Sequence, residues 1–323
     1  MTMRPAASAK RSGSKSHPAP SHAPQRTVEP SDQASRLPHS GIKHILVCVD
    51  GTDNDRTVLD QALQVALRFG SHIDVLHVRF DVYGATVDRQ ERRIDRLLDK
   101  PVEHIVAEAA ARAHRHFEEW HAQCGLPLRE SGTAVRGPSS QWREITGYED
   151  DVIARLGRVS DLIAVARKGA GASTFSAMAL ETALFETGRP VLMVPVGTPA
   201  DLFYRPLIAW NGSREAARAV GFALPFLREC EGCVEIFSAP ESKHHANTEE
   251  LLRYLGWHDI VADRISSDDA RATGMSLLAQ ASAHRTGLIV MGAYTHGHYR
   301  QFLFGGMTRH VMEHAAVPIL FAH

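Results

Sequence analysis

The sequence has few cysteines, no long hydrophobic run and no excess of charge of either sign. Four cysteines in 323 residues are too few for a disulfide framework, which favours a reducing cytoplasm. No segment reaches the roughly 18 consecutive apolar residues of a membrane helix, and residues 1–30 lack the apolar core of a signal peptide. Because 36 basic and 37 acidic side chains nearly cancel, we expect neither a membrane nor a nucleic-acid partner.

Several enzyme motifs are also missing. The chain contains no G-x-x-x-x-G-K-[ST] phosphate loop, no G-x-S-x-G elbow and no H-E-x-x-H zinc motif. His310 and His314 share a helix face, but no cysteine and no carboxylate except Glu313 lies near them in the sequence, so we expect no metal site. The sequence therefore nominates no catalytic residue and leaves open whether the protein is an enzyme.

Residues 1–41 differ in composition from the rest of the chain. They hold 6 of the 16 prolines, and Val28 and Leu37 are their only aliphatic core formers. Six basic residues face only Glu29 and Asp32, so the segment carries a net charge of +4. Since it cannot bury enough apolar surface to offset the entropy of ordering, the composition predicts a disordered basic tail.

The remaining residues contain a long-period repeat. The chain reads IKHILVCVDGTDNDRTVLDQALQVALRFGSHIDVLHV from Ile42 and RPLIAWNGSREAARAVGFALPFLRECEGCVEIFSA from Arg205. The two halves also end alike, in FETGRPVLMVP and MEHAAVPILFA. Repetition of a unit this long indicates two copies of one domain, which we expect at residues 42–196 and 205–323.

Each copy alternates short apolar runs with segments of helical period. Alternation of runs that are apolar on both faces predicts an α/β fold with a parallel sheet covered by helices on each side. We therefore expect two tandem doubly wound sheets of five parallel strands. The predicted strands are 45–49, 73–78, 126–135, 162–166 and 191–194 in the first copy, and 206–210, 233–238, 259–265, 288–292 and 317–321 in the second. The predicted helices of the first copy are 53–69, 102–123, 139–157 and 174–187.

A polar residue and a glycine close the first strand of each copy, as Asp50-Gly51-Thr52 and Asn211-Gly212-Ser213. Ligands of doubly wound sheets bind beyond the carboxyl ends of the strands, where these residues fall. Thr52 and Ser213 are also placed to cap the following helices. The alternative interpretation is a plain turn followed by a helix cap.

A second candidate is the segment that follows strand four of the second copy, MGAYTHGHYRQFLFGGMTRHVMEHAAVPIL from Met291. Gly292 ends the strand, and Gly305 and Gly306 precede a predicted helix. Backbone N–H groups at such a helix start can bind phosphate oxygens. The alternative is that these glycines only let the loop and the helix pack closely.

The tandem repeat, the Val-Asp-Gly-Thr and Trp-Asn-Gly-Ser turns and the Met-Gly, Gly-Gly and Val-Pro-Ile-Leu ending resemble a two-domain universal stress protein over residues 42–323. The resemblance implies a nucleotide-binding α-hydrolase-like fold with strand order 3-2-1-4-5 in each half. It also implies an ATP site, with a divalent metal accompanying the nucleotide. Its residues would be Ala209, Trp210, Asn211, Met291, Gly292, Thr295, Gly305, Gly306 and Thr308 in the second half, with Asp50 in the first.

The chain departs from the family's ATP-binding pattern at named positions. Thr295 stands where the pattern has its second glycine, Gly306 where it has a phosphate-binding hydroxyl, and Asn211 where it has an aspartate. Thr308 is a candidate replacement for the hydroxyl. In the first half Ala166 replaces the strand-four glycine, and Glu181 falls near the start of the last helix, where its charge would repel phosphate.

These features predict a stress-associated regulatory protein that binds an adenine nucleotide, or senses a related ligand, chiefly in its second half. The alternatives are a slow ATP hydrolase that uses the same pocket and a nucleotide-free interaction scaffold. The linker between the halves is short, so we expect them to pack as a pseudo-dimer through strands 191–194 and 319–322. A homodimer of the whole chain is also open.

Deleting residues 1–40 tests the interpretation of the tail. Because this segment has almost no core formers, the deletion should leave the melting temperature measured by circular dichroism nearly unchanged. A fall of more than about 4 °C would correspond to a loss on the order of 1 kcal/mol and would contradict a dispensable tail.

Overall fold

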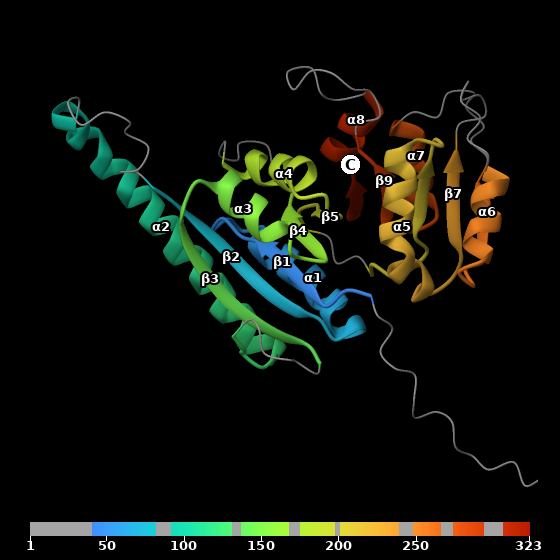
Figure 1. The fold of residues 1–323 in the computed structure, drawn as a ribbon, viewed down its shortest axis with the longest axis horizontal. Helices are drawn as coiled ribbons and strands as arrows, with labels where there is room; N and C mark the ends of the chain where they lie inside the picture. The colour runs from blue at the N-terminus through green and yellow to red at the C-terminus, as the bar shows by residue number, and fades with distance from the viewer. Residues whose placement is uncertain are drawn as a thin grey trace, which may run out of the picture. The chain divides into compact units, whose positions relative to one another are not determined.

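The computed structural model describes residues 41–81, 92–130, 137–167, 175–197, 201–238, 248–265, 274–293 and 306–323 (Figure 1). The predicted tail, apart from Gly41, lies outside these residues. Within the described part of the chain, no helix is both long and apolar enough to cross a membrane.

The first half contains alternating strands and helices. In chain order they are β1 (His44–Cys48), α1 (Asp55–Phe69), β2 (His72–Phe80), α2 (Arg92–Cys124), β3 (Ser139–Gly147), α3 (Glu149–Gly157), β4 (Leu162–Ala166), α4 (Phe175–Glu186) and β5 (Val191–Val194). Valine, isoleucine and leucine dominate β1 and β4, and the middle residues of both strands are buried. Burial on both faces is the pattern of a parallel strand between two layers of helices.

The second half repeats the same order of elements. They are β6 (Leu207–Trp210), α5 (Arg214–Arg228), β7 (Val234–Ser238), α6 (Thr248–Gly256), β8 (Ala262–Ile265), α7 (Gly274–Ala283), β9 (Ile289–Gly292), α8 (Gly306–His314) and β10 (Ile319–Ala322). Helix α5 shows how the sequence sets these elements: its small and apolar residues Ala216, Ala219, Val220, Ala223 and Phe226 recur at helical spacing and are buried.

The described strands form one sheet in the order β3-β2-β1-β4-β5-β10-β9-β6-β7-β8. Within each half the pairs are parallel and follow the expected order 3-2-1-4-5, so the predicted doubly wound α/β fold is confirmed. The predicted pairing of strands 191–194 and 319–322 is present, because β5 and β10 pair with each other and join the two five-stranded sheets into one.

The pairing of β5 with β10 is antiparallel, with Leu320 opposite Leu192 at its centre. Every residue of both strands is buried. Since the last strand of each half would otherwise expose a row of N–H and C=O groups, the pairing satisfies both edges at once.

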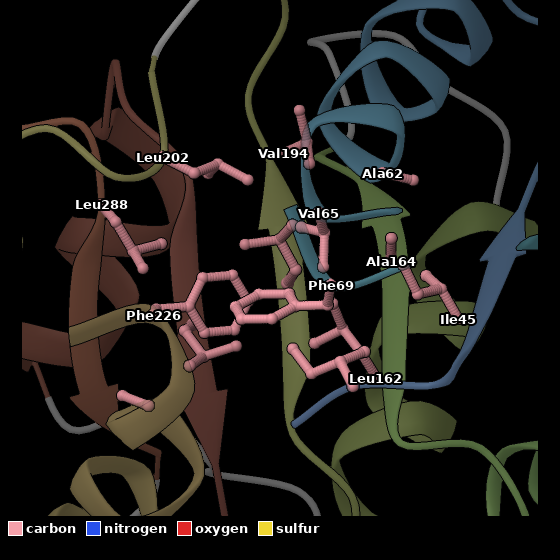
Figure 2. Packing of buried hydrophobic residues seen from close by; sticks show 14 of the residues in the cluster. Ile45, Ala62, Val65, Phe69, Leu162, Ala164, Val194, Leu202, Phe226 and Leu288 are labelled. Atoms are coloured by element: carbon pink, nitrogen blue, oxygen red, sulfur yellow. The ribbon is translucent and has the colours of Figure 1, made fainter. Parts of the chain in front are cut away.

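Aromatic residues from both halves fill the space beside this join. Figure 2 shows Phe69 of α1 next to Phe226 of α5, and their ring centroids lie 5.9 Å apart at an angle of 78°. Phe203, in the segment between β5 and β6, stacks on Phe226 at 5.8 Å. Burying one such ring contributes about 1.5–3 kcal/mol, so these contacts bind the two halves together.

The third strand of the first half lies at other residues than the sequence predicted. We expected a strand at 126–135 and a helix over 139–157, whereas residues 139–147 form β3 and the helix begins only at Glu149. The segment Ser-Ser-Gln-Trp-Arg-Glu-Ile-Thr-Gly alternates between more and less buried positions in its second half, as a strand at a sheet edge does. Its pairing with all nine residues of β2 outweighs the helical preference of Arg143 and Glu144.

A buried carboxylate occupies the same register position of the second strand in each half. Asp74 lies opposite Leu46, and Glu235 lies opposite the matching residue of β6, Leu207. Hydrogen bonds from His44, His72 and Arg143 reach Asp74 at 3.1, 3.1 and 2.8 Å. Burial alone would raise the pKa of Asp74, but these partners together hold it well below its usual value.

Glu235 also contacts two basic side chains. Arg205 pairs with its Oε1 atom, and His284 Nδ1 lies 2.8 Å from the same oxygen. The second oxygen, Oε2, is buried and has no hydrogen-bond partner among the described residues.

Two glycines provide a matched test of the packing. A Cβ atom at Gly287 would lie 1.7 Å from the backbone oxygen of Asp201, whereas one at Gly221, inside α5, would meet no atom within 4 Å. Gly287→Ala should therefore lower the free energy of unfolding by about 3 kcal/mol. Gly221→Ala should raise it by up to about 1 kcal/mol, because alanine favours the helix. Urea denaturation measures both changes, and equal effects would contradict the packing at Gly287.

Candidate functional site

The carboxyl ends of β6 and β9 meet at a cavity of about 180 Å³. These are the first and fourth strands of the second half, and the winding direction of the sheet reverses between them. The described lining residues are Ala209, Trp210, Asn211, Phe237, Met291, Gly292 and Met307. The structure thus brings together five of the residues that the sequence predicted for a nucleotide site, and adds Phe237 and Met307.

The turn after β6 caps helix α5. Asn211 Oδ1 accepts a hydrogen bond from Ser213 N at 3.1 Å, and Ser213 Oγ accepts one from Ala216 N at 3.1 Å. Ser213 is therefore the N-cap that the sequence predicted. The amide NH₂ of Asn211 has no hydrogen-bond partner within the described residues, so the turn-and-cap role leaves a donor at the cavity.

Trp210 provides a second donor beside the cavity. Its indole Nε1 is buried and has no acceptor in the part of the chain that the structure describes. A buried N–H without a partner destabilises the fold by about 1–3 kcal/mol, so an acceptor supplied by a ligand or by water would be favoured here.

Gly292 is required by packing. A Cβ atom at this position would lie 2.4 Å from Ala216 N, so only glycine lets β9 approach the first turn of α5 this closely. Gly292 therefore has a packing role against α5, and it also lines the cavity.

Helix α8 begins at Gly306, next to the cavity. Its first turn has no acidic residue, a Cβ at Gly306 would meet nothing within 4 Å, and Met307 lines the cavity. The first N–H groups of a helix lack intrahelical partners and carry a partial positive charge. Thr308 is buried and is not among the lining residues, and Thr295 and Gly305 lie outside the described residues.

In the matching turn of the first half, Asp50 and Thr52 hydrogen-bond to each other. Asp50 Oδ1 accepts hydrogen bonds from Thr52 N at 3.1 Å and from Thr52 Oγ1 at 2.6 Å. The expectation that Thr52 caps α1 is thus wrong: the N-cap is Asn54, and the hydroxyl of Thr52 donates to Asp50 instead.

The buried carboxylate of Asp55 also hydrogen-bonds to the backbone of this turn. Asp55 is 1% exposed, and its oxygens accept hydrogen bonds from Asp50 N at 3.1 Å and Gly51 N at 3.0 Å. His116 Nδ1 of α2 lies 3.0 Å from the same carboxylate. An internal anion therefore already occupies the loop amides of the first half.

In the second half, no carboxylate accepts hydrogen bonds from the matching turn amides within the described residues, although Glu215 is buried in the first turn of α5. Asp55 follows Asp50 by five residues, and the residue five places after Asn211 is Ala216, whose side chain cannot accept a hydrogen bond. The amides of Asn211 and Gly212 accordingly have no partner within the described residues. Sequence reasoning missed Asp55, although an aspartate at the first residue of a helix is a recognisable signal.

Helix α2 also covers the loop of the first half. Arg112 Nε donates to Gly51 O at 3.1 Å, and a Cβ atom at Gly51 would lie 2.4 Å from Ala109 O. The backbone of Gly51 has a φ of 80°, which glycine adopts without strain.

Glu181 does not lie where the sequence analysis expected it. Helix α4 already begins at Phe175 and has no acidic residue in its first turn. Glu181 instead lines a groove of about 730 Å³ together with Asp150 and Asp151 of α3. The charge of Glu181 therefore does not explain why the turn of the first half is unavailable to a phosphate. The carboxylate of Asp55, which already accepts hydrogen bonds from the amides of that turn, explains it instead.

Comparisons with known proteins agree with this fold. The sequence profile described as "Universal stress protein family" matches residues 41–178. A universal stress protein from Archaeoglobus fulgidus DSM 4304 is 17% identical, with 86% of this chain and 97% of that chain covered and a TM-score of 0.56. No curated protein matches the sequence.

Two further solved structures cover about half of this chain. A universal stress protein from Lactobacillus plantarum is 15% identical, covering 48% of this chain and 98% of its own, with a TM-score of 0.33. A universal stress protein in complex with cAMP is 18% identical, covering 48% of this chain and 98% of its own, with a TM-score of 0.28.

The titration of Asp55 provides a test of the closed loop. Burial, followed by the nearby charge of Asp50, raises the pKa of Asp55 to about 6, while the hydrogen bond from His116 lowers it. A carboxyl carbon should therefore titrate near pH 6 by NMR, and His116→Ala should move that midpoint upward.

The same shift makes a prediction about stability. Because the folded state holds the proton more tightly than the unfolded state, the contribution of Asp55 to stability is full below about pH 4 and is lost as the pH rises to about 6. The loss amounts to about 3 kcal/mol and should be absent from Asp55→Asn. Asp53→Asn, at an exposed neighbour, should behave as the wild type, and a wild type without this pH dependence would contradict a buried Asp55.

Proposed function

We propose that this chain, whose residues 41–178 match the universal stress protein family, is a stress-associated regulatory protein that binds an adenine nucleotide and acts through binding. The observation that carries the proposal is the cavity at the carboxyl ends of β6 and β9, beside the start of α8. A binding site at this point of a doubly wound sheet combines strand ends, a glycine and a helix N-terminus.

The lining of the cavity suits a flat aromatic base. Ala209, Phe237 and Met291 supply apolar walls, and the unpaired amide of Asn211 and the indole N–H of Trp210 supply donors for ring nitrogens. The phosphates would then extend toward the first turn of α8, where Gly306 leaves the backbone accessible.

We propose that the second half is the binding half. In the first half, the carboxylate of Asp55 already satisfies the amides of Asp50 and Gly51. A phosphate near that carboxylate would meet like charge, at about 4 kcal/mol for unit charges 4 Å apart in an effective dielectric of 20. The second half has Ala216 at the matching position, and the carboxylate of Glu215, in the first turn of α5, accepts no hydrogen bond from the amides of the turn within the described residues.

A divalent ion would arrive with the nucleotide. The described lining of the cavity holds no carboxylate, because Asn211 stands where the family pattern has an aspartate. We therefore propose that phosphate oxygens, and not protein carboxylates, would hold such an ion in this half.

We also propose that residues 42–196 and 205–323 act as an intramolecular pseudo-dimer. The antiparallel pairing of β5 with β10 supports this, because a strand edge of each half is used up inside one chain. The four cysteines are free, which fits our proposal of a cytoplasmic protein.

Calorimetric titration with ATP and Mg²⁺ tests the site. We expect one site per chain, abolished or weakened at least tenfold by Gly306→Asp, since a carboxylate there repels phosphate. An aspartate in the first turn stabilises a helix, so this variant should fold. Phosphate release in the same samples distinguishes binding from slow hydrolysis.

Two control variants sharpen the result. Gly306→Asn adds a side chain of the same size without its charge and should bind more tightly than Gly306→Asp. Met178→Asp makes the matching change in α4 of the first half and should leave the affinity unchanged. Two equal sites, or sensitivity to Met178→Asp alone, would show that the second half is not the binding half.

A further inference from the structure

A second cavity, of about 550 Å³, lies at the opposite end of the sheet from the nucleotide cavity. It adjoins Gly287, which precedes β9, whereas the nucleotide cavity adjoins Gly292 at the end of that strand. The lining residues are Asp201, Tyr204, Leu278, Ala281, Ser282, Arg285, Thr286, Gly287, His314, Ala316 and Val317. Its volume falls in the range of about 300–1,000 Å³ that is usual for small-molecule sites.

Two opposite charges line this cavity without pairing. Asp201 Oδ1 accepts a hydrogen bond from Phe203 N at 3.0 Å, and the carboxylate has no ion-pair partner among the described residues. The guanidinium of Arg285 likewise has no acidic partner in the described part of the chain. A single cavity therefore offers one unpaired anion and one unpaired cation.

The backbone at Arg285 is strained. Its φ of 54° lies in the left-handed region, and it follows helix α7 where Thr286 N bonds back to Ala281 O. Helix α1 ends in the same way with Gly70, which adopts a φ of 67° without strain. Strain at a cavity wall points to a requirement for the side chain, because glycine would fit the backbone better.

The remaining walls combine apolar surface with unsatisfied polar atoms. Leu278, Ala281 and Val317 provide the apolar part. Thr286 is 3% exposed, and its Oγ1 atom has no hydrogen-bond partner within the described residues. A buried hydroxyl without a partner is rare in folded proteins, which supports a polar ligand or ordered water at this wall.

We propose that this cavity binds a free α-amino acid with an apolar side chain. The ligand's carboxylate pairs with Arg285, whose planar guanidinium can donate two parallel hydrogen bonds. Its ammonium group pairs with Asp201, and its side chain packs on Leu278 and Val317. A zwitterion with an apolar body matches the cation, the anion and the apolar wall of this cavity.

Calorimetric titration of the full chain with L-leucine tests the proposal. We expect one saturable site per chain, weakened at least tenfold by Arg285→Gln and by Asp201→Asn. Arg253→Gln, at an exposed arginine of α6 that lines neither cavity, is the matched control and should bind as the wild type. Glutamine at 285 keeps a side chain on the same backbone, and melting curves verify that each variant is folded.

Ligand analogues identify which group each residue holds. Leucinamide, which lacks the carboxylate, should bind at least tenfold more weakly than leucine and should lose nothing further in Arg285→Gln. Isocaproate, which lacks the ammonium group, should show the same relation to Asp201→Asn. Tighter binding of isocaproate than of leucine would overturn the amino-acid assignment in favour of a simple carboxylate site.

No saturable binding of leucine up to millimolar concentration would also overturn the proposal, as would equal weakening by Arg285→Gln and Arg253→Gln. The test is separate from that of the nucleotide site, because the two cavities lie at opposite ends of β9. Arg285→Gln should leave ATP binding unchanged.

Discussion

The antiparallel pairing of β5 with β10 is the interaction on which the rest of the structure depends. Each half on its own would end its sheet in a buried, apolar strand with open hydrogen-bonding groups. Pairing Leu192 with Leu320 closes both edges, and it places α1 and α5 so that Phe69 and Phe226 can pack together (Figure 2). Arg68 completes the contact: its guanidinium lies 4.7 Å from the centre of the Phe203 ring and 3.2 Å from Glu231.

Within this shared sheet the two halves have diverged at the turn after the first strand. In the first half Asp55 fills the turn with its own carboxylate, and Arg112 of α2 holds the turn's carbonyl. In the second half Ser213 only caps α5, which leaves Asn211 and Trp210 with unused donors beside a cavity. One fold thus supports a closed turn and an open one, and the difference depends on the residue five places after the polar residue of the turn, which is Asp55 in the first half and Ala216 in the second.

The sequence was sufficient for the repeat and the doubly wound fold, because runs that are apolar on both faces alternate with amphipathic helices. The strand order within each half was implied only by the resemblance to a known family. The prediction failed at residues 139–147, where strongly polar residues such as Arg143 and Glu144 read as a helix. Their strand conformation depends on pairing with β2, and Arg143 also neutralises the buried Asp74. Such a non-local contact leaves no local signal in the sequence.

The candidate site divides in the same way. Asn211, Gly292 and Gly306 stand out in the sequence because turns and helix starts need special residues at fixed positions. The sequence did not reveal that the turn of the first half is occupied, because this needs Asp55, Arg112 and His116 to meet from two helices. The sequence by itself determined two α/β repeats and the strand ends where a ligand would bind. Only the tertiary structure decided which strand end is free, because hydrogen bonds between residues distant in the chain use up one turn and leave the other open.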